Sequence, residues 1–172
     1  MNATINRCRS RLFALIAFLI ITSPCFSEGL CNENENAVFS FDTKAKKNLS
    51  VCKHKNNDYF VYRYGTTLKI EMQYPSVLDI TSWQAFTFSG MRRGGGKANA
   101  GFGDYDLLFS INRFNYVVFQ TWSDEEDTYA IGVLVRNDKK KSETRINGLR
   151  ETKKGSLVLL EEDSNYIINA AM

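Results

Sequence analysis

Residues 105–122 read YDLLFSINRFNYVVFQTW, two apolar and aromatic segments separated by the dipeptide Asn112-Arg113. The segments Tyr105–Ile111 and Phe114–Trp122 are rich in the aromatic and branched residues that favour strands. Two such segments joined by only two residues are typical of a tight β-hairpin. The stretch therefore predicts an antiparallel hairpin in the second half of the chain.

Further β-prone segments lie on both sides of this hairpin, each bounded by turn-forming residues. In Leu68–Tyr74 (LKIEMQY) apolar and polar residues alternate, which places the apolar side chains on one face of a half-buried strand. The other segments are Ala37–Thr43, Leu49–Lys53, Tyr59–Tyr64, Gln84–Ser89, Tyr129–Arg136 and a weaker one at Thr144–Leu149.

The pattern as a whole indicates one all-β, mainly antiparallel domain over residues 28–172. No long apolar stripe with a helical period occurs, and the hydrophobic content of 44% is typical of a packed globular chain. About eight strands predict a small barrel or a sandwich, two architectures that hide sheet edges. The tail Ser156–Met172 favours a strand or irregular end, with a short C-terminal helix from Leu157 as the alternative.

Residues 1–27 have the three-part layout of a secretory signal peptide. Three arginines and no acidic residue precede ten apolar residues, Leu12–Ile21, and small residues around Phe26 place the cleavage after Ser27. A membrane-spanning helix needs about 20 apolar residues, so the run is too short for one. We expect export to the periplasm or the exterior, with no stable membrane anchor after cleavage.

Charge argues against a nucleic-acid partner. Three of the 22 basic residues lie in the leader, so the mature domain carries 19 basic and 19 acidic residues and has no net charge. Proteins that bind nucleic acid are recognised by an excess of basic residues, which neutralise phosphates. We therefore expect no nucleic-acid binding.

Two cysteines, Cys31 and Cys52, remain once the leader is removed. In an oxidising compartment two cysteines most simply form a disulfide with each other. A zinc site is the alternative, but the only histidine, His54, and two distant cysteines cannot supply four ligands. We expect a Cys31–Cys52 disulfide, no metal and no cofactor.

The segment Met91–Lys97 (MRRGGGK) is the most unusual of the chain. Glycines let the backbone approach a ligand closely, and guanidinium groups bind carboxylate or phosphate in a planar fork. This combination makes a candidate partner-binding site, with a plain solvated loop as the alternative. Its residues are Arg92, Arg93, Gly94, Gly95 and Gly96.

Catalytic patterns are missing from the sequence, and we expect no enzyme. Neither GxSxG nor HExxH occurs, and His54 follows a cysteine predicted to be oxidised, so it is interpreted as a solvated turn residue. A pair of carboxylates for glycoside hydrolysis leaves no sequence spacing, so a hydrolase stays open as a third function. The candidate acids are Glu71, Asp104, Asp106 and the run Asp124–Asp127.

Several short motifs follow one another in the order Phe39-Ser40-Phe41, Leu49-Ser50-Val51-Cys52, Tyr62-Arg63-Tyr64-Gly65, Lys69-Ile70-Glu71, Tyr74-Pro75, Arg93-Gly94-Gly95-Gly96 and Tyr116-Val117-Val118. Over about Phe39 to Val135 this order resembles a group of small, largely uncharacterised secreted bacterial β proteins. The resemblance implies no particular activity. Members often carry cysteine at the position of Phe41 and glycine at that of Arg113, so the Cys31–Cys52 pairing rests on the residues alone.

A shorter likeness, from Phe88-Ser89-Gly90 through the hairpin, is to periplasmic lysozyme inhibitors of the small β-barrel type. Export, a disulfide and a rigid β frame favour a protein-binding module that blocks another protein, as a lysozyme inhibitor or as an immunity protein against a toxin. The expected partner is thus a hydrolase or a toxin. The alternative is a domain that binds carbohydrate or the cell envelope through exposed aromatic residues, which in a small β domain otherwise serve as core.

Overall fold

The computed structural model describes residues 29–96 and 98–170, so the predicted signal peptide lies outside the described residues. Most of the described chain is β structure, as predicted. The strands are β1 (Glu35–Asp42), β2 (Asn48–His54), β3 (Phe60–Thr66), β4 (Lys69–Tyr74), β5 (Thr87–Arg93), β6 (Phe102–Ile111), β7 (Phe114–Ser123), β8 (Thr128–Asn137), β9 (Ser142–Asn147), β10 (Lys154–Gly155) and β11 (Ile168–Asn169). Three 3₁₀ helices accompany them, η1 (Ile80–Ala85), η2 (Arg150–Thr152) and η3 (Leu157–Glu161).

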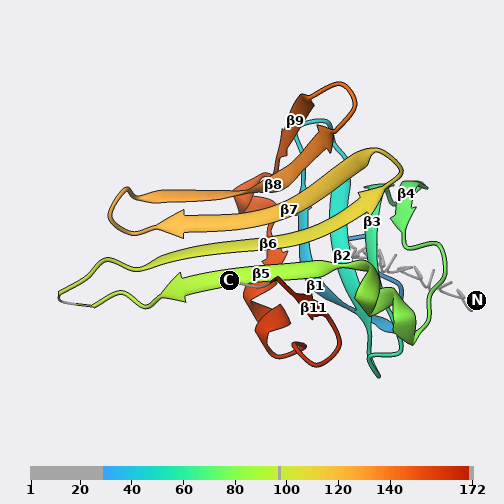
Figure 1. The fold of residues 1–172 in the computed structure, drawn as a ribbon, viewed down its shortest axis with the longest axis horizontal. Helices are drawn as coiled ribbons and strands as arrows, with labels where there is room; N and C mark the ends of the chain where they lie inside the picture. Colours follow the sequence, from blue (N-terminus) through green and yellow to red (C-terminus); the bar gives the residue numbers. More distant parts are fainter. Residues whose placement is uncertain (1–28, 97, 171–172) are drawn as a thin grey trace, which may run out of the picture.

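The strands form two sheets packed against each other, which confirms the all-β class and selects the sandwich over the barrel. One sheet has the order β10-β1-β2-β3-β4 and the other the order β11-β5-β6-β7-β8-β9. All strand pairs are antiparallel except the short pair of β11 with β5. In Figure 1 the strands of the six-stranded sheet cross those of the other sheet. Within the described residues an isolated backbone bridge between Thr43 and Gly148 joins the two sheets at one corner. The sheets do not close into a barrel.

The predicted hairpin pairs β6 and β7 over their whole length. β6 and β7 pair without interruption from Phe102↔Ser123 to Ile111↔Phe114. The two-residue turn begins at Asn112, whose φ of 54° lies in the left-handed region that asparagine tolerates better than most residues. The strand twist is thereby continued through the turn, and the hairpin becomes the centre of the six-stranded sheet.

Several elements differ in detail from the sequence prediction. Gln84 lies in η1 instead of a strand, because Asp79 caps this helix by accepting a hydrogen bond from the Thr81 amide at 2.8 Å. β4 is an edge strand, with Met72 half-buried against the core but Leu68 almost fully exposed in the preceding turn. The tail takes the helical alternative, as the one-turn helix η3, before the short strand β11.

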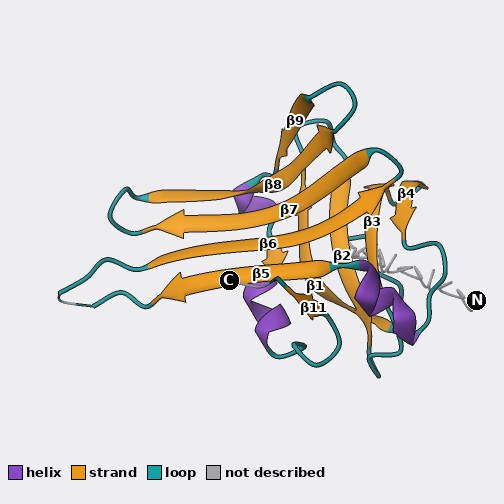
Figure 2. Cartoon of the chain, in the orientation of Figure 1, coloured by secondary structure: helices purple, strands orange, loops and turns teal. Residues whose placement is uncertain are grey.

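The core lies between the two sheets and is rich in aromatic rings. Phe109 stacks on Tyr116 with ring centroids 4.8 Å apart, and Phe60 stacks on Trp83 at 4.5 Å. η3 adds Leu157 and Leu160, both fully buried, to the same cluster. No described helix is long and apolar enough to cross a membrane. Figure 2 shows η1 and η3 in the lower half of the view and η2 partly hidden behind β8.

Candidate functional site

The strands β5–β8 extend well beyond the five-stranded sheet, and this projecting end carries the unusual residues of the sequence (Figure 1). The continuous core reaches along β6 to Tyr105 and along β8 to Ile131. Past these positions the two hairpins continue to the β5–β6 loop, residues 94–101, and the β7–β8 turn, residues 124–127. At this end the segment from η2 to η3 faces the inner side of the hairpins, with Glu161 of η3 in contact with Arg92 and Tyr105.

Arg92 and Arg93 belong to the end of β5 and not to the loop. Successive side chains of a strand point to opposite faces. Arg92 accordingly reaches Glu161 of η3 on the inner face, with an N–O distance of 2.9 Å. Arg93 donates to the Ala100 carbonyl at 3.0 Å, and its guanidinium lies 5.1 Å from the Phe102 ring centroid. The two arginines therefore do not form one joint anion site.

The glycine loop is held to the neighbouring turn by Asp124. The Asp124 backbone amide donates to the Gly101 carbonyl at 2.9 Å, and the Asp124 carboxylate accepts from the Gly101 amide at 3.1 Å. A Cβ on Gly101 would lie 2.5 Å from that carboxylate and 2.9 Å from the Gly95 nitrogen, so the absence of a side chain at Gly101 allows this close approach. Gly94 and Gly96 have nothing within 4 Å of such a Cβ and leave the loop surface open.

A stack of aromatic rings supports the inner face of the projecting end. The Tyr105 and Trp122 rings are nearly parallel, with centroids 5.6 Å apart. Each ring lies over a glycine of the adjacent strand, Tyr105 over Gly90 and Trp122 over Gly103, where any Cβ would overlap the ring. The Tyr105 hydroxyl donates to Glu161 at 2.5 Å, so the carboxylate that pairs with Arg92 also anchors this stack. Burial first and this hydrogen bond second raise the pKa of Tyr105 to about 12.

A pocket of about 370 Å³ opens beside this stack, between the β7–β8 hairpin and the segment from η2 to η3. It is lined by Gln120, Trp122, Ser123, Asp124, Asp127, Thr128, Tyr129, Arg150, Lys153, Ser156 and Val158. Its volume lies in the range typical of small-ligand sites. The lining combines aromatic rings, cations and carboxylates, which gives the pocket the means to hold a polar ligand.

The polar floor of this pocket is set by Gln120, which is buried. The Gln120 side-chain oxygen accepts from the Leu157 amide at 2.8 Å and from Ser156 Oγ at 3.0 Å. A backbone amide can only donate, so the opposite atom, 3.2 Å from the Tyr129 hydroxyl, is the Gln120 NH₂ group. The Tyr129 oxygen thus acts as acceptor, which leaves its own proton for another partner.

The other predicted carboxylates are spread over the molecule. Glu71 on β4 forms an exposed ion pair with Lys47 at 2.6 Å. Asp104 and Asp106 lie on the outer face of β6, opposite the pocket, because Tyr105 and Leu107 between them point into the core. Burial, together with the neighbouring Asp104 charge, raises the pKa of Asp106 to about 6. Only Asp124 and Asp127 of the candidate acids line the pocket.

His54 differs from its predicted environment as a solvated turn residue. It is the last residue of β2, and its side chain is only 18% exposed. The ring lies 5.1 Å from that of Tyr59, and Nδ1 is 2.9 Å from the Asp58 carboxylate. The histidine therefore packs on the end of the five-stranded sheet, far along the chain from the pocket residues.

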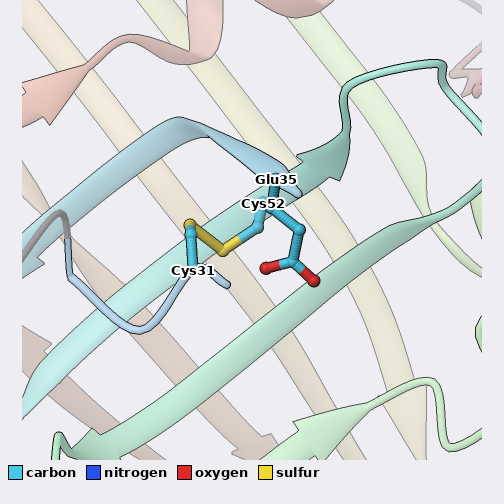
Figure 3. A group of neighbouring side chains, drawn as sticks. All are labelled: Cys31, Glu35 and Cys52. Atoms are coloured by element: carbon cyan, nitrogen blue, oxygen red, sulfur yellow. A yellow bond between two sulfur atoms is a disulfide. The ribbon is translucent and has the colours of Figure 1, made fainter. Parts of the chain in front are cut away.

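The predicted Cys31–Cys52 disulfide is present, and it fastens the segment before β1 to β2 (Figure 3). Glu35 lies beside it, so the three residues form a cluster with metal-ligand atoms. The sulfurs are bonded to each other, and Glu35 accepts hydrogen bonds from Arg63 at 2.5 and 2.9 Å and from Tyr59 at 2.9 Å. The cluster is therefore a structural brace. A disulfide is compatible with a periplasmic or extracellular protein.

Comparisons with protein families, curated proteins and solved structures find no match to this chain. The site must therefore be judged on its geometry. In the sequence Trp122 stands out only as the aromatic end of the predicted strand Phe114–Trp122, and no motif marks Tyr129, Arg150 or Lys153 as members of a site. The alternation of β7 and β8 places Trp122 and Tyr129 opposite each other, but a sequence gives no sign that η2 folds over them.

Proposed function

We propose that the protein is an exported binding module that blocks another protein by inserting the projecting end of its β5–β6 hairpin, which carries Arg92, Arg93 and the glycine loop. The observation that carries the proposal is the bracing of both loops by Asp124. A tip whose two loops are bonded to each other at 2.9 and 3.1 Å loses little conformational entropy on binding. Export itself is part of the proposal and rests on the predicted leader.

The two arginines at the end of β5 favour a partner with an acidic cleft, and the exposed carboxylates of the β7–β8 turn, residues 124–127, must stay outside that cleft. Arg92 and Arg93 are exposed, and their present partners are a surface ion pair and a backbone carbonyl, both easily exchanged. Clefts of glycoside hydrolases hold paired carboxylates, with which arginine forms strong charge-assisted hydrogen bonds. A lysozyme is therefore the first candidate partner, and a secreted toxin with a comparable cleft is the second.

Enzyme inhibition tests this proposal directly. Purified domain 28–172 is titrated against lysozymes of different structural types, and hydrolysis of cell-wall substrate is measured. We expect stoichiometric inhibition of at least one type, weakened at least tenfold by Arg93→Gln. Arg113→Gln serves as the matched control, because Arg113 occupies the β6–β7 turn at the other end of the hairpin.

A parallel capture experiment covers the immunity alternative. The same domain is used as bait in an envelope and culture-supernatant extract of its source, and bound proteins are identified by mass spectrometry. Enrichment of one hydrolase or toxin, lost with Arg92→Gln and Arg93→Gln together, supports the proposal. Inhibition and capture that are both indifferent to these substitutions contradict the assignment of the tip.

A further inference from the structure

The pocket beside the Tyr105–Trp122 stack is a second site, which shares Asp124 and Asp127 of the β7–β8 turn with the loop tip. It is lined by residues of the β7–β8 hairpin and of the segment from Arg150 to Val158, and neither Arg92 nor Arg93 contributes to it. η2 packs beside β8 and so closes one wall. A function for the pocket can therefore be tested without reference to the tip.

Aromatic rings supply an apolar surface in the pocket. Trp122 and Tyr129 are directly opposite each other on β7 and β8, so both project from the same face of the sheet. Tyr105 supports the Trp122 ring from one side, and the missing Cβ of Gly103 lets the ring lie down on the sheet. A supported indole ring is a surface on which a flat apolar face, such as the C–H face of a sugar ring, can stack.

Charged groups stand on two opposite walls. The Arg150 guanidinium lies 4.4 Å from the Tyr129 ring centroid, where a cation–π contact holds it at the rim, and Lys153 follows on the same segment. Asp124 and Asp127 come from the β7–β8 turn on the other wall. Cations on one wall suit a carboxylate, and carboxylates on the other accept hydrogen bonds from hydroxyl groups.

The Tyr129 hydroxyl adds a donor at the floor. Its oxygen already accepts from Gln120, whose orientation is set by the Leu157 amide. Among the described residues nothing accepts the Tyr129 proton, so the hydroxyl can donate to water or to a ligand in the pocket. A tyrosine is protonated at neutral pH at its ordinary pKa of 10.0, and burial raises the pKa of Tyr129 further, so the donor is present.

We propose that this pocket binds a saccharide unit that carries a carboxylate. The sugar ring stacks on Trp122, the carboxylate pairs with Arg150 and Lys153, and hydroxyl groups donate to Asp124 and Asp127. Two sources provide this chemistry, a lactyl-bearing amino sugar of a bacterial wall and a uronic acid of an exopolysaccharide. Binding of such a unit next to the tip would place the module on the glycan that a wall hydrolase attacks.

The two tryptophans of the chain provide the readout in the unmodified protein. Trp122 lines the pocket, whereas Trp83 is fully buried and donates from Nε1 to the Asn57 carbonyl at 2.9 Å. In ¹⁵N–¹H NMR spectra of domain 28–172, each indole N–H gives its own signal. The Trp83 signal therefore monitors the fold, and the Trp122 signal monitors the pocket.

The domain is titrated separately with N-acetylmuramic acid, glucuronic acid, N-acetylglucosamine and acetate. We expect a saturable shift of the Trp122 signal with at least one acidic sugar, at least tenfold weaker binding of N-acetylglucosamine, and no change at Trp83. The stronger acidic sugar identifies the source. Arg150→Gln and Lys153→Gln are each expected to weaken binding about tenfold, and Arg113→Gln to leave it unchanged.

Three outcomes would overturn the proposal. In the first, none of the sugars shifts the Trp122 signal. In the second, acetate shifts it as much as the acidic sugars do. In the third, Arg150→Gln and Lys153→Gln both bind with unchanged affinity while the Trp83 signal confirms the fold. Inhibition of a lysozyme by a domain that fails this titration would leave the tip function intact, so the two proposals fail separately.

Discussion

Arg92 and Arg93 are neighbours on β5, yet their guanidinium groups lie on opposite faces of the six-stranded sheet. Arg92 joins η3 through Glu161 on the inner face, and Arg93 covers Phe102 on the outer face. An inserted tip thus presents one cation on each side. A partner that binds both arginines must carry acidic groups on two facing walls. A groove meets this requirement better than a flat surface.

The Arg92–Glu161 ion pair is expected to contribute little to stability. Both side chains are partly exposed, at 55% and 37%, and exposed pairs are worth about 0.2–1 kcal/mol. A double-mutant cycle with Arg92→Ala and Glu161→Ala, measured by urea unfolding, should give a coupling energy in that range. A coupling well above about 1 kcal/mol would show that η3 is clamped to β5 and that Arg92 is not available to a partner.

The sequence predicted the hairpin well because its information is local. Alternation and a two-residue turn at Asn112 determine both strands and their register. The predicted strand ended at Ser89, whereas β5 continues through Arg92 and Arg93, residues without β preference. These two residues are held in the strand because they pair with Gly103 and Phe102 on β6. Tertiary pairing here overrides local propensity.

The sequence did not predict the pocket, and the reason is different. Its two walls are separated by about twenty residues of chain, and the link between them is the hydrogen bonding of Gln120 to Ser156 and Leu157. No period or motif reports a contact of this kind. Trp122 was noted as an aromatic residue, but only the packing separates it from core residues such as Trp83, which is fully buried.

Removal of the disulfide should lower stability substantially. The cysteines are 21 positions apart, and the chain-entropy estimate for a loop of this length is about 3 kcal/mol. The double variant Cys31→Ser and Cys52→Ser should unfold at a correspondingly lower urea concentration than the oxidised protein. Reduction of the wild-type protein with dithiothreitol is the matching control. Equal midpoints for the three samples would speak against a stabilising role.

The buried pair of Glu35 and Arg63 predicts a second large effect. Burial alone would raise the pKa of Glu35, but hydrogen bonds from Arg63, the Asn32 amide and Tyr59 outweigh it and lower the pKa below 4.5. Glu35→Gln leaves Arg63 charged and uncompensated, which should cost about 3–5 kcal/mol at neutral pH. The matched control is Glu143→Gln, which breaks an exposed pair with Arg136 and should cost less than about 1 kcal/mol.

The pH dependence of the Glu35 variant follows from the same shift. A carboxyl group with a lowered folded-state pKa stabilises the protein above its unfolded-state pKa, and this stabilisation is lost as pH falls through the folded-state value. The difference in unfolding free energy between wild type and Glu35→Gln should therefore be largest near pH 7 and shrink below about pH 4. A difference that is constant from pH 7 to pH 3 would contradict the ionised pair.

Gly103→Ala should disturb the aromatic stack that supports the pocket. Its Cβ would overlap the Trp122 ring, and such overpacking typically costs about 1–3 kcal/mol. Gly94→Ala is the matched control, because nothing lies within 4 Å of its Cβ position, and should change stability by less than about 0.5 kcal/mol. Unfolding midpoints and the near-UV circular dichroism of the tryptophans measure both effects. Equal behaviour of the two variants would argue against close contact between Gly103 and Trp122.

Asp106 offers a test with the opposite sign of pH dependence. Burial first and the charge of Asp104 second raise its pKa from 3.8 to about 6, so the folded state holds this proton more tightly than the unfolded state. Stability should then fall as pH rises from about 4 to about 6, because the folded protein must ionise a half-buried carboxyl.

Asp106→Asn removes the cost of ionising this carboxyl. With allowance for solvent screening, we expect it to stabilise the protein by on the order of 1 kcal/mol at pH 7 and hardly at all at pH 3. Urea unfolding of both proteins at pH 3, 5 and 7 measures the difference, and Glu33→Gln, at an exposed position before β1, controls for loss of a surface charge. Because Asp106 lies on the face opposite the pocket, the substitution should leave sugar binding unchanged, and a stabilised variant that binds sugar normally shows that Asp106 takes no part in the pocket.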